Sequence, residues 1–87
     1  MEIEFDPVKD ASNVAKHGLS LADALRFDLL VATVVVDQRD DYGEVRYRAF
    51  QRLDGEGYCL AFAVRGEVVR PISLRRAHDK EMRRHGW

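Results

Sequence analysis

The segment that decides the fold is EVRYRAFQRLDGEGYCLAFAVRGEVVRPISL, which runs from Glu44 to Leu74. Apolar and polar residues alternate along it, and alternation at a period of two residues indicates strands. Turns that contain glycine, at residues 54–57 and 66–67, divide the segment into three parts. It therefore predicts an antiparallel meander of three strands, at Glu44 to about Leu53, Tyr58 to Arg65 and Val68 to Leu74.

Two short helices are predicted before the meander. The first runs from Pro7 to about His17, because Asp6 suits an N-cap, proline suits the first helical position and Gly18 suits the left-handed residue that ends a helix. Its apolar positions recur at helical spacing and its polar positions occupy another side, as Val8, Ala11, Val14 and Ala15 against Lys9, Asn13 and Lys16. The second helix follows Ser20, which forms a capping-box variant with Asp23, and is expected to turn inward Leu21, Ala24, Leu25 and Phe27.

The remaining elements complete one domain. Ile3 and Phe5 predict a short first strand, and the apolar run from Leu29 to Val36 predicts a buried strand. A turn-rich loop at residues 40–43 precedes the meander, and a final helix covers about Asp79 to His85. The 87 residues are thus predicted to form a single α+β domain over 1–87, with an N-terminal strand, two short helices, an antiparallel β-meander and a C-terminal helix.

Charge is distributed unevenly along the chain, although its formal net charge is only -1. Residues 1–44 carry ten acids and four bases, a balance of -6, whereas residues 45–87 carry five acids and ten bases, a balance of +5. Many arginines of the second half alternate with apolar residues at strand spacing, so several can converge on one surface. Such a surface is expected to bind phosphate groups.

Several classes of protein are disfavoured. Cys59 is the single cysteine and lies in an apolar setting, so we expect a buried inert thiol and neither a disulfide framework nor a zinc site. The acidic start of the chain, MEIEF, is unlike a secretory signal, and its longest apolar run is far short of the roughly 20 residues that cross a bilayer. We therefore expect a cytoplasmic protein with no membrane contact, no metal and no cofactor.

Motifs in both halves of the chain point to one family. The first half holds Lys9, Asn13, Lys16-His17-Gly18-Leu19-Ser20, Ala24 and Phe27-Asp28. The second half holds Glu44-Val45-Arg46-Tyr47 and Arg70-Pro71-Ile72-Ser73-Leu74-Arg75-Arg76-Ala77, followed by Glu81. In their order and spacing, over nearly the whole chain, these motifs resemble those of the BrnT-type ribonuclease toxins of type II toxin–antitoxin systems.

The resemblance implies a RelE-like fold and an endoribonuclease that cuts RNA, free or on the ribosome, so that translation and growth stop. It also implies a cognate BrnA-type ribbon-helix-helix antitoxin as the partner, with operator DNA reached only through that antitoxin. Gln51, Pro71 and His85 depart from the family pattern. They favour an alternative, a catalytically inactive toxin-fold binding module that modulates an antitoxin–operator complex.

Metal-independent RNA cleavage needs a base for the ribose 2′-hydroxyl, cations for the developing phosphorane charge and an acid for the leaving oxygen. Arginine suits the second role, because its planar fork binds two phosphate oxygens and keeps its charge. The catalytic candidates are Lys16, His17, Glu44, Arg46, Arg70 and Arg75, and the RNA-binding candidates are Arg48, Arg65 and Arg76. Pro71 removes a backbone donor, which predicts a sheet edge or a bulge; without a bulge, Arg70 and Arg75 lie on opposite strand faces.

Several candidates also have structural interpretations. His17 could cap the end of its helix, and Glu44 could pair with Arg46. Tyr47 is expected in the core, which leaves Tyr42 or Tyr58 as an aromatic surface for RNA bases. The terminal tryptophan could fray or dock, and four acids are candidates for docking basic antitoxin residues, namely Asp37, Asp40, Asp41 and Glu44.

Overall fold

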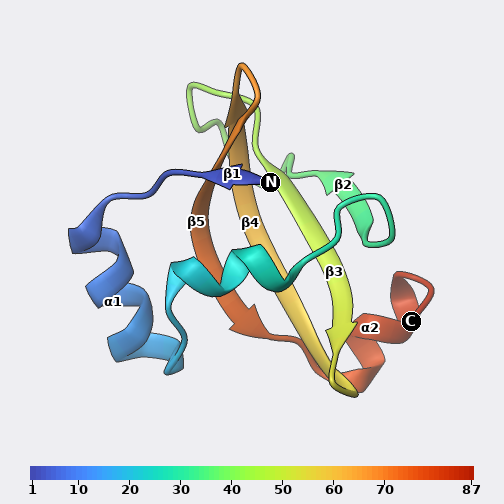
Figure 1. Ribbon diagram of the computed structural model, residues 1–87. Helices are drawn as coiled ribbons and strands as arrows, with labels where there is room; N and C mark the ends of the chain where they lie inside the picture. The colour runs from blue at the N-terminus through green and yellow to red at the C-terminus, as the bar shows by residue number, and fades with distance from the viewer.

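The computed structural model describes all of residues 1–87 and confirms the α+β class. One five-stranded mixed sheet, in the order β1-β5-β4-β3-β2, is flanked by short helices (Figure 1). The elements in chain order are β1 (Glu2–Ile3), α1 (Pro7–His17), the 3₁₀ helix η1 (Leu21–Arg26), β2 (Thr33–Val36), β3 (Tyr47–Leu53), β4 (Glu56–Arg65), β5 (Val68–Arg76) and α2 (Asp79–Arg84). None of the helices combines the length and apolarity that a membrane span requires.

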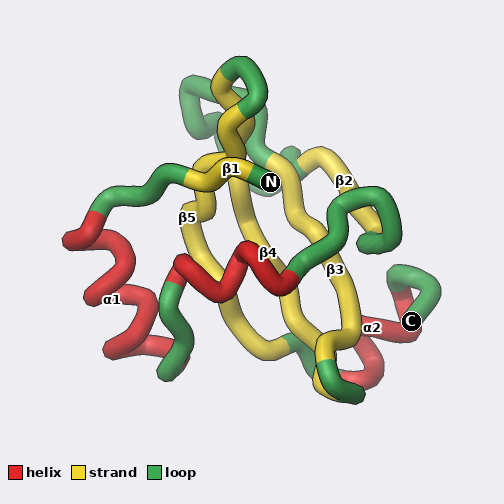
Figure 2. The backbone as a smooth tube through the Cα atoms, in the orientation of Figure 1, coloured by secondary structure: helices red, strands yellow, loops and turns green.

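The predicted meander is confirmed. Strands β2 to β5 pair antiparallel in sequence order, and β1 adds to the outer edge of β5 in parallel, so that the strands form one continuous curved sheet (Figure 2). Asp54 and Gly55 both have positive φ angles, 52° and 81°, which is the geometry of a two-residue hairpin between β3 and β4. β3 begins at Tyr47 rather than Glu44, so the loop before it is longer than expected.

A bulge interrupts the pairing of β4 with β5. Ala61 lies opposite Ser73 whereas Phe62 lies opposite Pro71, which leaves Ile72 as an extra residue in β5. Proline has no N–H to donate to the neighbouring strand, so a break in the ladder at this point is the physical consequence of the sequence. The bulge that Pro71 predicted is therefore present.

The two faces of the sheet are covered unequally. η1 crosses one face (Figure 1), where Leu21, Ala24 and Phe27 pack on buried residues of β3, β4 and β5, including Leu60 and Leu74. On the other face a smaller cluster lies under α2, and it consists of Phe50, Cys59, Ala77 and Met82. Burial raises the pKa of the Cys59 thiol, in agreement with the predicted inert thiol. The rest of this second face is not covered by a helix.

Helix α1 has the predicted bounds, but the side that it buries is not the one with the apolar positions. Asp6 accepts a hydrogen bond from the Val8 N–H, and Gly18 ends the helix at φ 70°. The apolar side faces outward, however, since Val8 is 76% exposed, and the buried residue of the helix is Asn13. The reason lies in the edge of β5: β1 pairs only with its first two residues, and Asn13 supplies the missing partners of Leu74 further along.

Other predictions need correction at the surface. η1 is a 3₁₀ helix that buries Leu21 and Ala24 but leaves Leu25 57% exposed, because only one side of so short a helix meets the sheet. The run from Leu29 to Val36 is not a buried strand. Only Thr33–Val36 form a strand, β2, which lies at the sheet edge, and Leu30 in the segment before β2 is 98% exposed. At the end of the chain Trp87 docks, with its indole Nε1–H donating to the Thr33 hydroxyl at 3.1 Å.

Candidate functional site

The bulge in β5 brings arginines from two strands onto one face of the sheet. Arg48 lies opposite Ala61, Arg70 opposite Ala63 and Arg75 opposite Cys59, and these three residues of β4 alternate along one face. Arg46, two residues before Arg48, continues the same side of the chain into the loop. We call these four side chains, Arg46, Arg48, Arg70 and Arg75, the arginine face; it lies opposite the face that η1 covers.

Three members of the arginine face keep unused hydrogen-bonding capacity. The Nε atoms of Arg46, Arg48 and Arg70 are shielded from solvent and have no acceptor within the protein. Buried donors are normally paired, so donors left without a partner mark a place where a ligand can supply one. Phosphate oxygens are acceptors that match the guanidinium fork.

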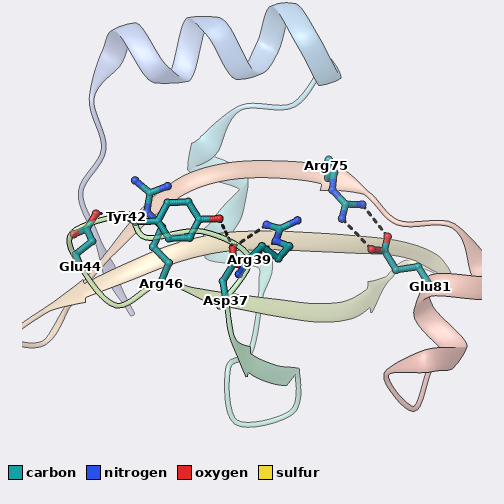
Figure 3. Close-up of polar contacts among 7 residues, drawn as sticks. All are labelled: Asp37, Arg39, Tyr42, Glu44, Arg46, Arg75 and Glu81. Carbon is teal, nitrogen blue, oxygen red and sulfur yellow. Dashed lines mark hydrogen bonds and ion pairs between the residues drawn. The ribbon is translucent and has the colours of Figure 1, made fainter.

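Two acids hold the ends of the arginine face (Figure 3). Glu81 of α2 accepts two hydrogen bonds from Arg75, at 2.8 and 3.0 Å, which lowers the pKa of the Glu81 carboxyl and raises that of the Arg75 guanidinium. At the other end Glu44 lies 3.6 Å from the Nε of Arg46, an ion pair too long for a hydrogen bond. Two of the three predicted catalytic arginines, Arg75 and Arg46, therefore have a carboxylate partner, whereas Arg70 has none.

A third acid anchors the loop between β2 and β3. Arg39 donates two hydrogen bonds of 2.8 Å to the Asp37 carboxylate, whose side chain is 2% exposed, and the Tyr42 hydroxyl donates a third at 3.2 Å. The Arg39 hydrogen bonds hold the pKa of the Asp37 carboxyl well below its usual range, although burial alone would raise it. The loop is thereby fixed between the two ends of the arginine face (Figure 3).

The aromatic residue beside the arginines is Tyr42. The Arg46 guanidinium lies over its ring at 4.1 Å from the centroid, a cation–π contact. Tyr58 is buried in the core and cannot present a surface to RNA bases. Tyr47 stacks on Phe62 at 5.4 Å on the face that η1 covers, as predicted.

Lys16 and His17 lie apart from the arginine face, in a shallow groove between α1 and β5. The groove has a volume of about 240 Å³ and is lined by Lys9, Ser12, Asn13, Lys16, His17, Ile72 and Ser73. A second hollow of about 30 Å³ shares Lys9 and Ile72 with it and reaches Glu44 and Arg70. We call the first cavity the α1–β5 groove; it leads toward the arginine face rather than forming part of it.

A comparison with known protein families decides the identity. Residues 5–81 match the family described as ribonuclease toxin, BrnT, of type II toxin-antitoxin system. The chain belongs to the BrnT family. Membership implies an RNA substrate and an antitoxin partner, and it supports ribonuclease activity. No curated protein matches the chain.

The two remaining arginines proposed from the sequence of this BrnT chain differ in position. Arg65 ends β4, exposed, on the strand side that carries Ala61 and Ala63. Arg76 lies opposite Tyr58 on the face that η1 covers, and it pairs with Glu56 at 3.7 Å. The structure thus brings Arg65 to the side of the arginine face and separates Arg76 from it.

Sequence reasoning about the BrnT chain did not select His85 as a site residue. Its ring stacks on Phe50 at 3.8 Å with an interplanar angle of 9°, at the α2 end of the uncovered face. Burial and, next, the charge of Arg48 lower the pKa of His85, so that its imidazole is neutral near pH 7. The sequence marked His85 only as a departure from the family pattern, and its nearness to Arg48 depends on how α2 folds back.

Two departures from the BrnT pattern do not touch the arginine face. Gln51 is buried on the face that η1 covers and accepts a hydrogen bond from the Asp28 N–H at 2.9 Å. Pro71 lies opposite Phe62 on that same face. Both residues therefore serve the core and the bulge.

No three His, Cys, Asp or Glu side chains gather where they could hold a metal ion.

Proposed function

We propose that this BrnT protein is a RelE-like endoribonuclease that cleaves RNA without a metal, through attack of a ribose 2′-hydroxyl on the adjacent phosphate. The observation that carries the proposal is the alignment of Arg46, Arg48, Arg70 and Arg75 on one open sheet face by the bulge at Ile72. Charge accumulates on the phosphorane oxygens as the 2′-oxygen attacks, and fixed cations stabilise that charge more than they stabilise the starting phosphate.

The arginines divide the work between orientation and contact. Two hydrogen bonds to Glu81 fix the direction of Arg75, and Arg46 lies over the Tyr42 ring with Glu44 at ion-pair distance, so both are positioned before substrate arrives. Neither Arg48 nor Arg70 takes part in any of the six ion pairs, so the charge of both is available to phosphate oxygens. A phosphate above the middle of this face would therefore meet two free guanidinium groups between two oriented ones.

The proton transfers are assigned to groups at the ends of the arginine face. His85, neutral near pH 7 and close to Arg48, is proposed to accept the proton of the 2′-hydroxyl or to return it to the leaving 5′-oxygen. Glu44, beside Arg46, is the second candidate for these transfers. Lys16 and His17, which line the α1–β5 groove, are proposed to bind the RNA rather than to transfer protons.

Comparison of two arginines of the same strand tests the proposal. Arg70→Ala removes a cation from the arginine face, whereas Arg76→Ala removes one from the opposite face, where it pairs with Glu56. We expect R70A to lower kcat for RNA cleavage by about 10²-fold or more, as loss of one preorganised donor does, and R76A to lower it less than about twofold. A time course of RNA cleavage in buffer containing EDTA, with the new RNA 5′ ends mapped, measures kcat for both variants.

Equal activity of R70A and R76A would refute the role of the arginine face. If the folded wild-type protein produced no new RNA ends, the inactive binding module would become the better account. In cells, we propose that cleavage inhibits translation and that a BrnA-type ribbon-helix-helix antitoxin neutralises it. Growth arrest on expression of wild type but not R70A, relieved by the co-expressed antitoxin, is the expected result.

A further inference from the structure

We propose that the α1–β5 groove is a second phosphate site, which binds the RNA backbone outside the bond that is cut. The inference rests on the proposed ribonuclease function and adds to it a subsite on a different part of the molecule. The groove is lined almost entirely by polar side chains, with Ile72 as the single apolar one, and three of its residues are the bases Lys9, Lys16 and His17. That composition suits a phosphodiester backbone.

The orientation of α1 explains why cations line this groove. Asn13 fixes one side of the helix against β5, because its amide donates to the Leu74 carbonyl at 2.9 Å and accepts from the Leu74 N–H at 3.0 Å. Lys9 and Lys16 lie four residues before and three residues after Asn13, so both share the side of the helix that faces the strand. They are about 10 Å apart along the helix axis, which is longer than one phosphate group.

Neither lysine is neutralised within the protein. Six ion pairs join other side chains, but none includes Lys9 or Lys16. The hydroxyls of Ser12 and Ser73 add neutral donors to the same groove. The charge of the groove is therefore free for a ligand, unlike that of Arg75 at the end of the arginine face.

The position of the groove favours RNA as the ligand. The small hollow that contains Arg70 shares Lys9 and Ile72 with the groove and is also lined by Asp6 and Glu44, so the groove lies next to the end of the arginine face. Single-stranded RNA is long enough to occupy both places at once. An acidic segment of the antitoxin is the competing ligand, and the experiment separates the two.

Salt dependence of RNA binding tests the subsite directly. The probe is a 12-nucleotide RNA with every 2′-hydroxyl methylated, which can bind but cannot be cut through 2′-oxygen attack. Each phosphate contact to single-stranded RNA contributes about 0.7 to the slope of log K against log salt concentration. We expect Lys9→Ala combined with Lys16→Ala to lower the magnitude of this slope by about 1.4, which weakens binding about tenfold at 0.15 M salt.

The matched control is Lys80→Ala combined with Arg83→Ala, which removes two positive charges from exposed positions of α2. Its slope should stay close to that of wild type. With the unmethylated RNA, the groove variant should raise KM about tenfold and change kcat less than about twofold, because its lysines bind a part of the substrate that does not react.

An unchanged slope and KM in the groove variant, with wild-type cleavage intact, would overturn the subsite and leave the proposed function standing. Loss of antitoxin affinity with normal RNA binding would also overturn it, since the groove would then be a protein-binding site. If the wild-type protein neither bound nor cut RNA, the proposed function and the subsite would both fail.

Discussion

Replacement of Asn13 with alanine should cost more stability than any other polar substitution in α1. The Asn13 side chain makes three hydrogen bonds: it donates to the Leu19 carbonyl at 2.7 Å and exchanges two with Leu74 at 2.9 and 3.0 Å. Leu74 is 1% exposed, so water cannot replace the lost partners without opening the structure. At about 1 kcal/mol for each bond, the expected loss is about 3 kcal/mol.

Such a loss is large for a chain of this size. A domain of 87 residues is expected to have a free energy of unfolding of roughly 4 to 13 kcal/mol, and 3 kcal/mol corresponds to a fall in Tm of roughly 15 °C. Urea denaturation of Asn13→Ala beside Ser12→Ala measures the difference, because Ser12 is the exposed neighbour and makes none of these hydrogen bonds. S12A should stay within about 0.5 kcal/mol of wild type.

A second substitution separates hydrogen bonding from packing. Asn13→Asp has nearly the same shape, and its carboxylate can still accept from the Leu74 N–H, but it has no donor for the Leu74 or Leu19 carbonyl. It also buries a charge, so at pH 7 it should be at least as unstable as N13A. If N13A and N13D both matched S12A in stability, the role of Asn13 as the partner of the β5 edge would be wrong.

Two further changes follow from contacts near α2. His85→Phe keeps the stacking on Phe50 but removes a group whose pKa is lowered in the fold. Because the unfolded chain binds a proton at His85 more readily than the folded chain does, the free energy of unfolding of the wild type should fall as the pH drops below about 6.5. Urea denaturation at pH 7.5 and 5.5 should show that H85F lacks this part of the fall. Gly57→Ala would place a Cβ 2.7 Å from the Ala77 carbonyl oxygen and 2.5 Å from Met82 Cγ. The free energy of unfolding, measured by thermal unfolding, should therefore fall by about 2 kcal/mol. An unchanged Tm would contradict the close packing of α2 on β4.

Local chemistry made much of the fold predictable. Asp6, Pro7 and Gly18 bound α1 by their own side-chain and backbone preferences, and these preferences hold wherever the helix packs. Positive φ at Asp54 and Gly55 similarly fixes the β3–β4 hairpin. The side that α1 turns to the sheet was not predictable from periodicity, because it depends on an unpaired stretch of β5 about 60 residues away, which Asn13 satisfies better than an apolar side chain could.

Most residues of the candidate site were also predictable from the sequence. Arg46, Arg48, Arg70 and Arg75 were all selected from strand spacing and motif, and Pro71 gave the signal for the bulge that aligns them. His85 could not be placed beside Arg48 from sequence, since that contact requires α2 to pack on Phe50. The bidentate pairing of Arg39 with Asp37 was missed for another reason: the two residues lie in a loop, where no periodicity indicates direction.

The extra residue in β5 makes the site depend on the number of residues in the strand as well as on their identity. If Ile72 paired regularly instead of bulging, it would lie opposite Phe62, and Arg70 would move opposite Val64 on the face that η1 covers, with Pro71 taking its place among the cations. Every side chain of the site would still be encoded, yet the guanidinium groups would no longer meet. Relatives of this protein that keep four residues between the two arginines of β5 should therefore also keep the bulge, whereas a relative that lacks one of the four should align the same arginines on a regular strand.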